Sequence, residues 1–115
     1  SEKEACAGLE EEARDVGPIA RSGDVAATKV LSAGALFELR PRRGVSEESL
    51  ERSVQCHLAR SASLGHHMLG MGHCPLALKD VSAEVIDTGT TLAVAVESDD
   101  PGVVQEIWRR AKALE

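Results

Sequence analysis

Aromatic residues are almost missing from this 115-residue sequence, which has one phenylalanine (Phe37), one tryptophan (Trp108) and no tyrosine. Hydrophobic residues still make up 43% of the chain, so the core has to be built from aliphatic side chains and alanine. Each of these side chains buries less area than an aromatic ring, and we therefore expect a domain of modest stability. The lack of aromatic side chains to line a pocket also makes haem an unfavourable cofactor.

A long apolar run and an excess of positive charge are missing as well. No run approaches the roughly 18 apolar residues that a membrane-spanning helix needs. The formal net charge of -6 disfavours nucleic-acid binding and docking on anionic membranes, which both need basic residues. The brief basic cluster of Arg40, Arg42 and Arg43 is expected to be a solvated loop after a strand. The length is typical of one domain, and we treat residues 1–115 as a single domain.

Cysteine is scarce too, with only Cys6, Cys56 and Cys74. An odd and small number of cysteines does not describe a disulfide-stapled scaffold. One disulfide with one buried thiol would fit an exported protein, and three free thiols would fit the cytosol. Cys6 falls at the edge of a helical apolar face and is expected to be a buried, inert thiol. The disulfide that the sequence suggests for an exported protein is Cys56–Cys74, which would close a short loop.

Helical periodicity predicts three helices. The first spans residues 1–16. The second spans residues 46–64, is capped by the serine at its start, and places His57 near the middle of its inward apolar face. Cys56 is turned away from that face. The last helix begins at Asp100 and carries a continuous apolar arc, formed by Val103, Val104, Ile107, Trp108, Ala111 and Leu114.

Alternating apolar residues predict strands at residues 35–40, 81–86 and 92–96. The turn Asp87-Thr-Gly-Thr joins the last two strands into a hairpin, with glycine where a positive φ is needed. Residues 19–34 stay open between a short helix and an extended segment.

These elements predict an α+β fold. We expect a small antiparallel or mixed three-stranded sheet with helices on one face, in the order α-β-α-β-β-α. This order resembles an incomplete ferredoxin-like plait, a likeness of topology that carries no activity. The open sheet edges would let a second copy of the chain pair with an edge strand and form a homo-oligomer.

The one compositional anomaly is the stretch of residues 65–74, which gathers side chains with nitrogen or sulfur donors. It holds both methionines, three of the four histidines and one of the three cysteines. Thioether and thiolate are soft ligands that favour Cu(I), and imidazole suits copper, zinc and nickel. The mixture predicts a metal-binding module for sensing, storage or transfer, with copper preferred over zinc. The candidate ligands are His66, His67, Met68, Met71, His73 and Cys74, joined by Cys56 and His57 of the preceding helix.

The same stretch also has a purely structural interpretation. It lacks a Cys-x-x-Cys pair and the Met-x-Cys-x-x-Cys loop of ferredoxin-like copper chaperones. Its methionines could close one end of the core, while its histidines are solvated. His57 would then be a core histidine with satisfied hydrogen bonds rather than a ligand. The chain would be a non-catalytic interaction or regulatory domain.

A third hypothesis is thiol redox chemistry at Cys56. His57 is its neighbour and Arg60 follows one turn later, and a nearby cation lowers the pKa of a thiol. The runs 54–60 and 75–85 resemble OsmC-type peroxidases, which also place a cysteine on a helix before a strand. That resemblance implies a second catalytic cysteine in a later helix, and the last helix here has none.

Other enzyme classes have no motif to support them, because the sequence has no phosphate loop, nucleophile elbow or His-Glu-x-x-His pattern. We therefore favour a binding module over an enzyme, with a metal ion and a second copy of the chain as its partners. Histidine and methionine donors suit an oxidising compartment, and this composition favours a bacterial protein outside the cytoplasm, such as a periplasmic one.

Overall fold

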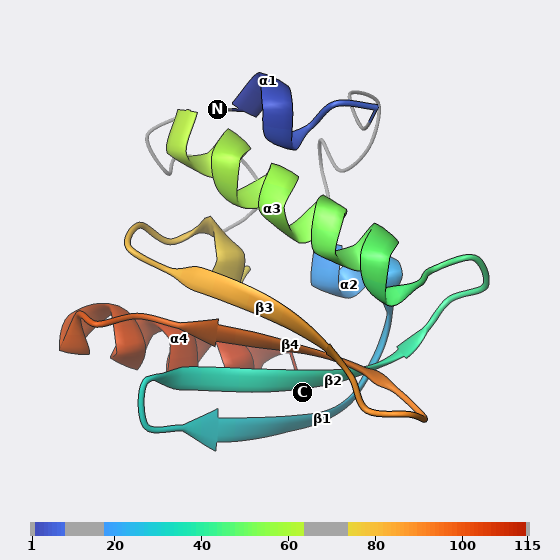
Figure 1. Cartoon of the computed structure of the whole chain (residues 1–115). Helices are drawn as coiled ribbons and strands as arrows, with labels where there is room; N and C mark the ends of the chain where they lie inside the picture. Colours follow the sequence, from blue (N-terminus) through green and yellow to red (C-terminus); the bar gives the residue numbers. More distant parts are fainter. Residues whose placement is uncertain (1, 9–17, 64–73, 115) are drawn as a thin grey trace.

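The computed structural model describes residues 2–8, 18–63 and 74–114 (Figure 1). Within these ranges the chain has an α+β fold, in which helices pack against a four-stranded antiparallel sheet. No helix in the described part of the chain is long and apolar enough to cross a bilayer. The elements in chain order are α1 (Glu2–Ala5), α2 (Pro18–Ser22), β1 (Gly23–Leu31), β2 (Gly34–Pro41), α3 (Glu47–Ser63), the 3-10 helix η1 (Pro75–Ala77), β3 (Ser82–Asp87), β4 (Leu92–Glu97) and α4 (Pro101–Ala113).

Two antiparallel hairpins form the sheet, in the strand order β1-β2-β4-β3. β2 pairs with β1 on one side and with β4 on the other, so the two hairpins meet at the centre of the sheet. In this register Phe37 of β2 lies opposite Val94 of β4, which in turn lies opposite Val85 of β3. The three predicted strands are confirmed as β2, β3 and β4, and Gly89 has the positive φ, 97°, that the β3–β4 turn requires.

The sheet has one strand more than the sequence predicts, so the three-stranded sheet and the incomplete ferredoxin-like plait are both wrong. The additional strand is β1, which occupies most of the segment that stayed open between helix and strand. β1 lies at one edge of the sheet, and most of its residues are exposed or half-buried. This exposure removes the clear apolar alternation by which a strand is recognised in a sequence.

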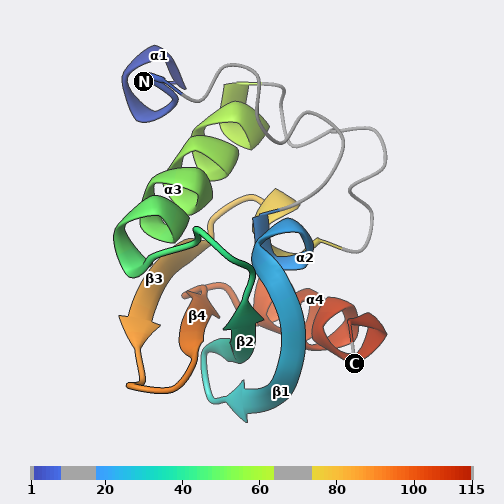
Figure 2. The same cartoon turned by 90° about the vertical axis from the view of Figure 1, so that its right-hand side faces the viewer.

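One core lies between the long helices α3 and α4 and the face of the sheet that carries Phe37. Figure 2 shows α3 over the β3 side of the sheet, with α4 beside β2 and β1. The short helix η1 packs against both α3 and α4, with Leu76 fully buried. On the other face of the sheet Ala93 and Ala95 of β4 are also buried. The core side chains include Leu50, Val54, Ile107, Phe37, Leu39, Val94 and Val96.

The second and the last predicted helices are confirmed as α3 and α4. The Oγ of Ser46 accepts the backbone N–H of Ser49 at 3.1 Å, so this serine caps α3. The Oδ1 of Asp100 accepts the N–H group two residues later at 2.8 Å and caps α4. Trp108 belongs to the predicted apolar arc but is 37% exposed. Its indole N–H donates to the carbonyl oxygen of Gly34 at 2.7 Å.

The first predicted helix is wrong in length. α1 ends at Ala5, and the turn that follows contains Gly8 at a φ of 80°. A positive φ at glycine is a common way for a helix to end. Pro18 begins the separate helix α2, since proline is favoured at a first helical position. Residues 9–17 of the predicted helix lie outside the described residues.

Side chains of α3 cover the outer edge of β3. Glu51 Oε2 accepts the N–H of Val85 at 3.2 Å, and Gln55 Nε2 donates to the carbonyl oxygen of Ala83 at 3.1 Å. Unpaired backbone groups on an edge strand are the template by which a second chain would pair. Two backbone groups at the β3 edge are therefore already bonded to α3 and cannot pair with a second chain, as the predicted homo-oligomer would need. The opposite edge of the sheet is β1.

Candidate functional site

Three of the predicted site residues lie in the described part of the chain. The structure brings His57 and Cys74 together and places Cys56 elsewhere. The predicted ligands that lie outside the described residues are His66, His67, Met68, Met71 and His73.

His57 points from α3 into the core, as its place on the inward face of the helix predicts. It is 1% exposed, and it follows Leu50 and Val54 on the same buried face. The Nδ1 atom of its ring has no hydrogen-bond partner in the described part of the chain. Buried polar atoms are usually paired, so this nitrogen is an exception among the described residues.

The imidazole of His57 is held in its neutral form. Burial, followed by the charges of Arg60 and Arg21, lowers the pKa of His57 to about 4. A neutral imidazole keeps a lone pair on one ring nitrogen, which is the state that binds a metal ion.

Cys74 lies at the start of η1, where the chain contacts both α3 and α4. It is the one free cysteine of the protein. Its side chain is partly buried, and its Sγ lies 3.7 Å from Nε2 of His57. A residue of the donor-rich stretch is thus in contact with a donor on α3, which sequence spacing alone did not establish.

Two opposing effects act on the thiol of Cys74. Burial raises its pKa, because a thiolate is poorly solvated at this position. The backbone N–H groups of Leu76 and Ala77 and the guanidinium of Arg110 act in the opposite direction. Burial dominates, so the thiol of the free protein stays protonated. The same donors are placed to stabilise a thiolate when a cation replaces the proton.

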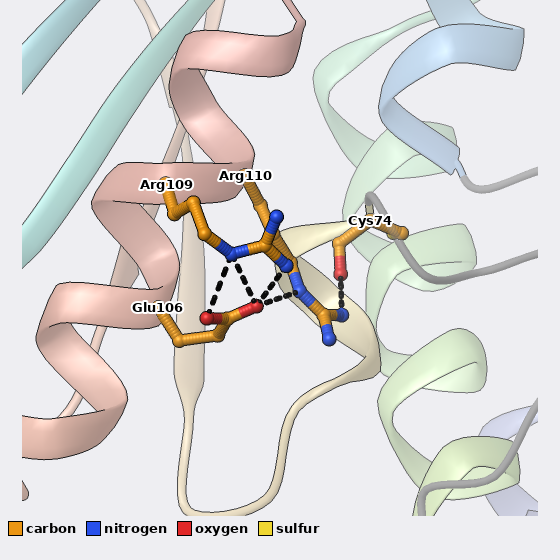
Figure 3. Close-up of polar contacts among 4 residues, drawn as sticks. All are labelled: Cys74, Glu106, Arg109 and Arg110. Carbon is orange, nitrogen blue, oxygen red and sulfur yellow. Dashed lines mark hydrogen bonds and ion pairs between the residues drawn. The ribbon is translucent and has the colours of Figure 1, made fainter.

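Arg110 of α4 fixes the backbone at Cys74. Its Nη1 donates to the Cys74 carbonyl oxygen at 2.8 Å, and its Nε donates to Glu106 at 3.0 Å (Figure 3). Hydrogen bonds from Arg109 and then from Arg110 lower the pKa of Glu106 to about 2, so this carboxylate stays ionised. Sequence reasoning missed Arg110, although its i,i+4 spacing from Glu106 was a signal that its side chain is held in place.

Cys56 forms a disulfide with Cys6, which ties α1 to α3. Both residues are 4% exposed. This pairing replaces the Cys56–Cys74 disulfide suggested by the sequence, and Cys6 is not the free thiol that we expected. A disulfide sulfur is neither a thiolate ligand nor a nucleophile. In this oxidised form Cys56 therefore leaves both the predicted ligand set and the predicted thiol redox site.

His57 and Cys74 supply two donors, which is fewer than the three or four that a trigonal or tetrahedral site needs. Among residues 2–8, 18–63 and 74–114 no group of three or more His, Cys, Asp or Glu side chains is placed to hold a metal ion. Further ligands would have to come from outside these ranges. The five ligands predicted there, between His66 and His73, stay predictions.

Comparisons of this chain with protein-family models, with curated proteins and with solved structures gave no match. The resemblance of residues 54–60 and 75–85 to OsmC-type peroxidases therefore gains no support from a family.

Proposed function

We propose that this protein is a metal-binding module with a preference for copper, in which His57 and Cys74 are two of the ligands. The observation that carries the proposal is the 3.7 Å separation of His57 Nε2 and Cys74 Sγ. With a metal–sulfur bond of about 2.3 Å and a metal–nitrogen bond of about 2.0 Å, two ligands of one ion lie roughly 3.5 Å apart at a tetrahedral angle. At a trigonal angle the same bonds place them roughly 3.7 Å apart. The observed separation therefore matches the spacing of two ligands of one ion.

The surroundings of the pair suit a bound cation better than they suit a free thiol. The imidazole is already neutral, so no proton has to leave His57 before it can bind. A cation that replaces the thiol proton of Cys74 offsets the burial that otherwise raises its pKa. The N–H groups of Leu76 and Ala77 then donate to the coordinated sulfur, as outer hydrogen bonds commonly do at metal sites.

The remaining donors decide which metal is preferred. A trigonal or tetrahedral Cu(I) site needs one or two ligands besides His57 and Cys74, and methionine thioethers favour copper over zinc. Cys56 is not among them while it is bonded to Cys6. The candidates that precede Cys74 in the sequence are His66, His67, Met68, Met71 and His73.

The Cys6–Cys56 disulfide also supports a location. Disulfides persist in oxidising compartments and are rare in the cytosol of most cells. We therefore place the protein outside the bacterial cytoplasm, as its histidine and methionine donors also suggest. Its net charge of -6 would mildly attract cations there. Sensing, storage or transfer of the ion fits these features better than catalysis does.

The direct test is a competition titration of the disulfide-bonded protein with Cu(I), and separately with Zn(II), against chelators of known affinity. A count of one free thiol before the titration shows that Cys6–Cys56 is intact and that Cys74 is reduced. We expect one Cu(I) to bind with a Kd well below about 1 μM, and Zn(II) to bind more weakly.

Matched variants separate the ligands from the fold. Cys74→Ser and His57→Gln should each weaken Cu(I) binding by at least about tenfold, because each removes one of the bonds to the ion. Val54→Ala is the control, since it removes packing from the same face of α3 and takes away no donor. Binding no tighter than micromolar, or equal binding by Cys74→Ser and the unaltered protein, would refute the proposal. The non-catalytic interaction domain would then be the better interpretation.

A further inference from the structure

A hollow of about 370 Å³ lies between α2, the loop after β2 and the first turns of α3. Three arginines line it, Arg21 from α2 and Arg42 and Arg43 from the loop. Its size falls within the range of small-molecule sites, which is roughly 300–1,000 Å³. The sequence predicts a solvated loop for the brief cluster of Arg40, Arg42 and Arg43. It gives no sign of the hollow, because Arg21 comes from a separate segment.

The charge in this hollow is one-sided. Among the described residues its lining contains no carboxylate. No described residue forms an ion pair with Arg42 or Arg43, and both are exposed. The protein as a whole carries a net charge of -6, so this positive cluster stands against an acidic background. Arg42 and Arg43 are neighbours of like charge, and a bound anion would offset the repulsion between them.

The backbone holds the arginine loop in place. The N–H of Arg42 donates to the carbonyl oxygen of Ser22 at 2.8 Å, which joins the end of β2 to the end of α2. The N–H of Val45 donates to the carbonyl oxygen of Arg42 at 3.1 Å, and Gly44 has the positive φ, 87°, that this turn needs. These bonds hold the backbone of Arg42 and the turn that follows it beside the end of α2 before any ligand arrives.

We propose that this hollow binds the phosphate group of a small molecule. Planar guanidinium groups bind phosphate oxygens through paired N–H donors, and the neighbouring Arg42 and Arg43 can both donate to one tetrahedral dianion. Ser53 adds a hydroxyl to the lining, while Val45 and the buried Leu50 provide an apolar wall for the rest of the ligand. This combination of a few convergent polar groups with apolar lining is typical of ligand sites.

The test is calorimetric titration of metal-free protein, at low ionic strength, with inorganic phosphate, glycerol 3-phosphate and succinate. We expect saturable binding of both phosphate compounds and at least about tenfold weaker binding of succinate, which lacks a tetrahedral dianion. The paired variant Arg42→Gln, Arg43→Gln should weaken phosphate binding by at least about tenfold. Arg40→Gln is the matched control, because Arg40 is exposed, lies two residues earlier and does not line the hollow.

The single variant Arg43→Glu gives a second readout if the paired variant unfolds, since one reversed charge should abolish phosphate binding. Failure of both phosphate compounds to saturate would overturn the proposal. So would an equal loss of binding in Arg40→Gln, or succinate binding in the absence of phosphate binding. Because the protein is free of metal throughout, these outcomes are independent of copper binding at His57 and Cys74.

Discussion

His57 makes the free energy of unfolding depend on pH, because the folded protein holds its imidazole neutral. The pKa of this group is lowered from 6.5 to about 4 in the folded state. Between these values the unfolded chain binds the proton more readily, so the stabilisation is complete above pH 6.5 and is lost as the pH falls towards 4. We expect the free energy of unfolding to fall by roughly 3 kcal/mol across this window, as measured by urea unfolding of metal-free protein.

The control for this prediction is His57→Gln, which has no imidazole to titrate. Its free energy of unfolding should change much less over the same pH range, and the remaining change would report the carboxylates. A pH dependence of equal size in the variant and the unaltered protein would show that His57 is not the group responsible.

Gly34 is a position where the sheet has no room for a side chain. A Cβ at this residue would lie 1.8 Å from the carbonyl oxygen of Val96 in β4. The backbone of β4 cannot move aside without breaking its pairing with β2. We expect Gly34→Ala to lower the free energy of unfolding by at least about 2 kcal/mol.

Gly102→Ala is the matched control, because its added Cβ would meet only a side-chain oxygen of Asp100, at 3.3 Å. This contact is tight but involves one side chain and no strand backbone, so the substitution should change the urea midpoint much less than Gly34→Ala does. If Gly34→Ala proved as stable as Gly102→Ala, the close approach of β2 and β4 at this point would be wrong.

The position of a site residue could be predicted where it depends only on residues nearby in the sequence. The 3.6-residue period of α3 identified His57 as inward-facing, and its burial confirms this. The partner of Cys56 depends on how α1 folds back over α3, and spacing along the chain carries no information about that contact. The bond from Arg110 to the carbonyl oxygen of Cys74 was hidden for the same reason.

At the scale of elements, Asp100 sets the beginning of α4. Its Oδ1 accepts the N–H groups of Gly102 at 2.8 Å and Val103 at 3.4 Å, which have no partner within the helix. We expect Asp100→Ala to lower the free energy of unfolding by about 1 kcal/mol. Asp99→Ala removes the same charge from the neighbouring position without removing a cap, and it should change the urea midpoint much less. Equal effects of the two variants would mean that charge, rather than capping, is what matters.

The elements that were predicted correctly are those with strong local signals. β3 and β4 flank a glycine-containing turn, and α3 and α4 each begin at a capping residue. β1 was missed because it has no clear alternation of apolar and polar residues. Its strand conformation comes from pairing with β2. Its register also shifts between Val25 and Ala27, and such an irregularity interrupts the alternation of faces.

At the scale of the whole molecule, the Cys6–Cys56 disulfide joins the two ends of a long loop. The sequence separation is 50 residues, for which chain entropy predicts about 4 kcal/mol of stabilisation. We expect the double variant Cys6→Ala, Cys56→Ala to lose most of this amount in urea unfolding. Cys74→Ala is the control, because its sulfur closes no loop. If reduction of the unaltered protein left its unfolding midpoint unchanged, the disulfide would not contribute to stability.

The fold class could be predicted and the topology could not. Composition and element order were sufficient for an α+β fold, because the helices and three of the strands carry their own patterns. The number of strands and their order depend on which edge β1 joins, and that is settled by pairing with β2 across the chain.

The fluorescence of Trp108 reports the contact between α4 and the β1–β2 turn. Trp108 is the only tryptophan, and no tyrosine is present, so the near-ultraviolet fluorescence of the protein arises from a single indole. The N–H of that indole is bonded to the carbonyl oxygens of Gly34 and Leu31, at the turn that joins β1 to β2. Its emission will shift to longer wavelength when α4 separates from this hairpin. The protein therefore carries an intrinsic reporter of helix docking that needs no label.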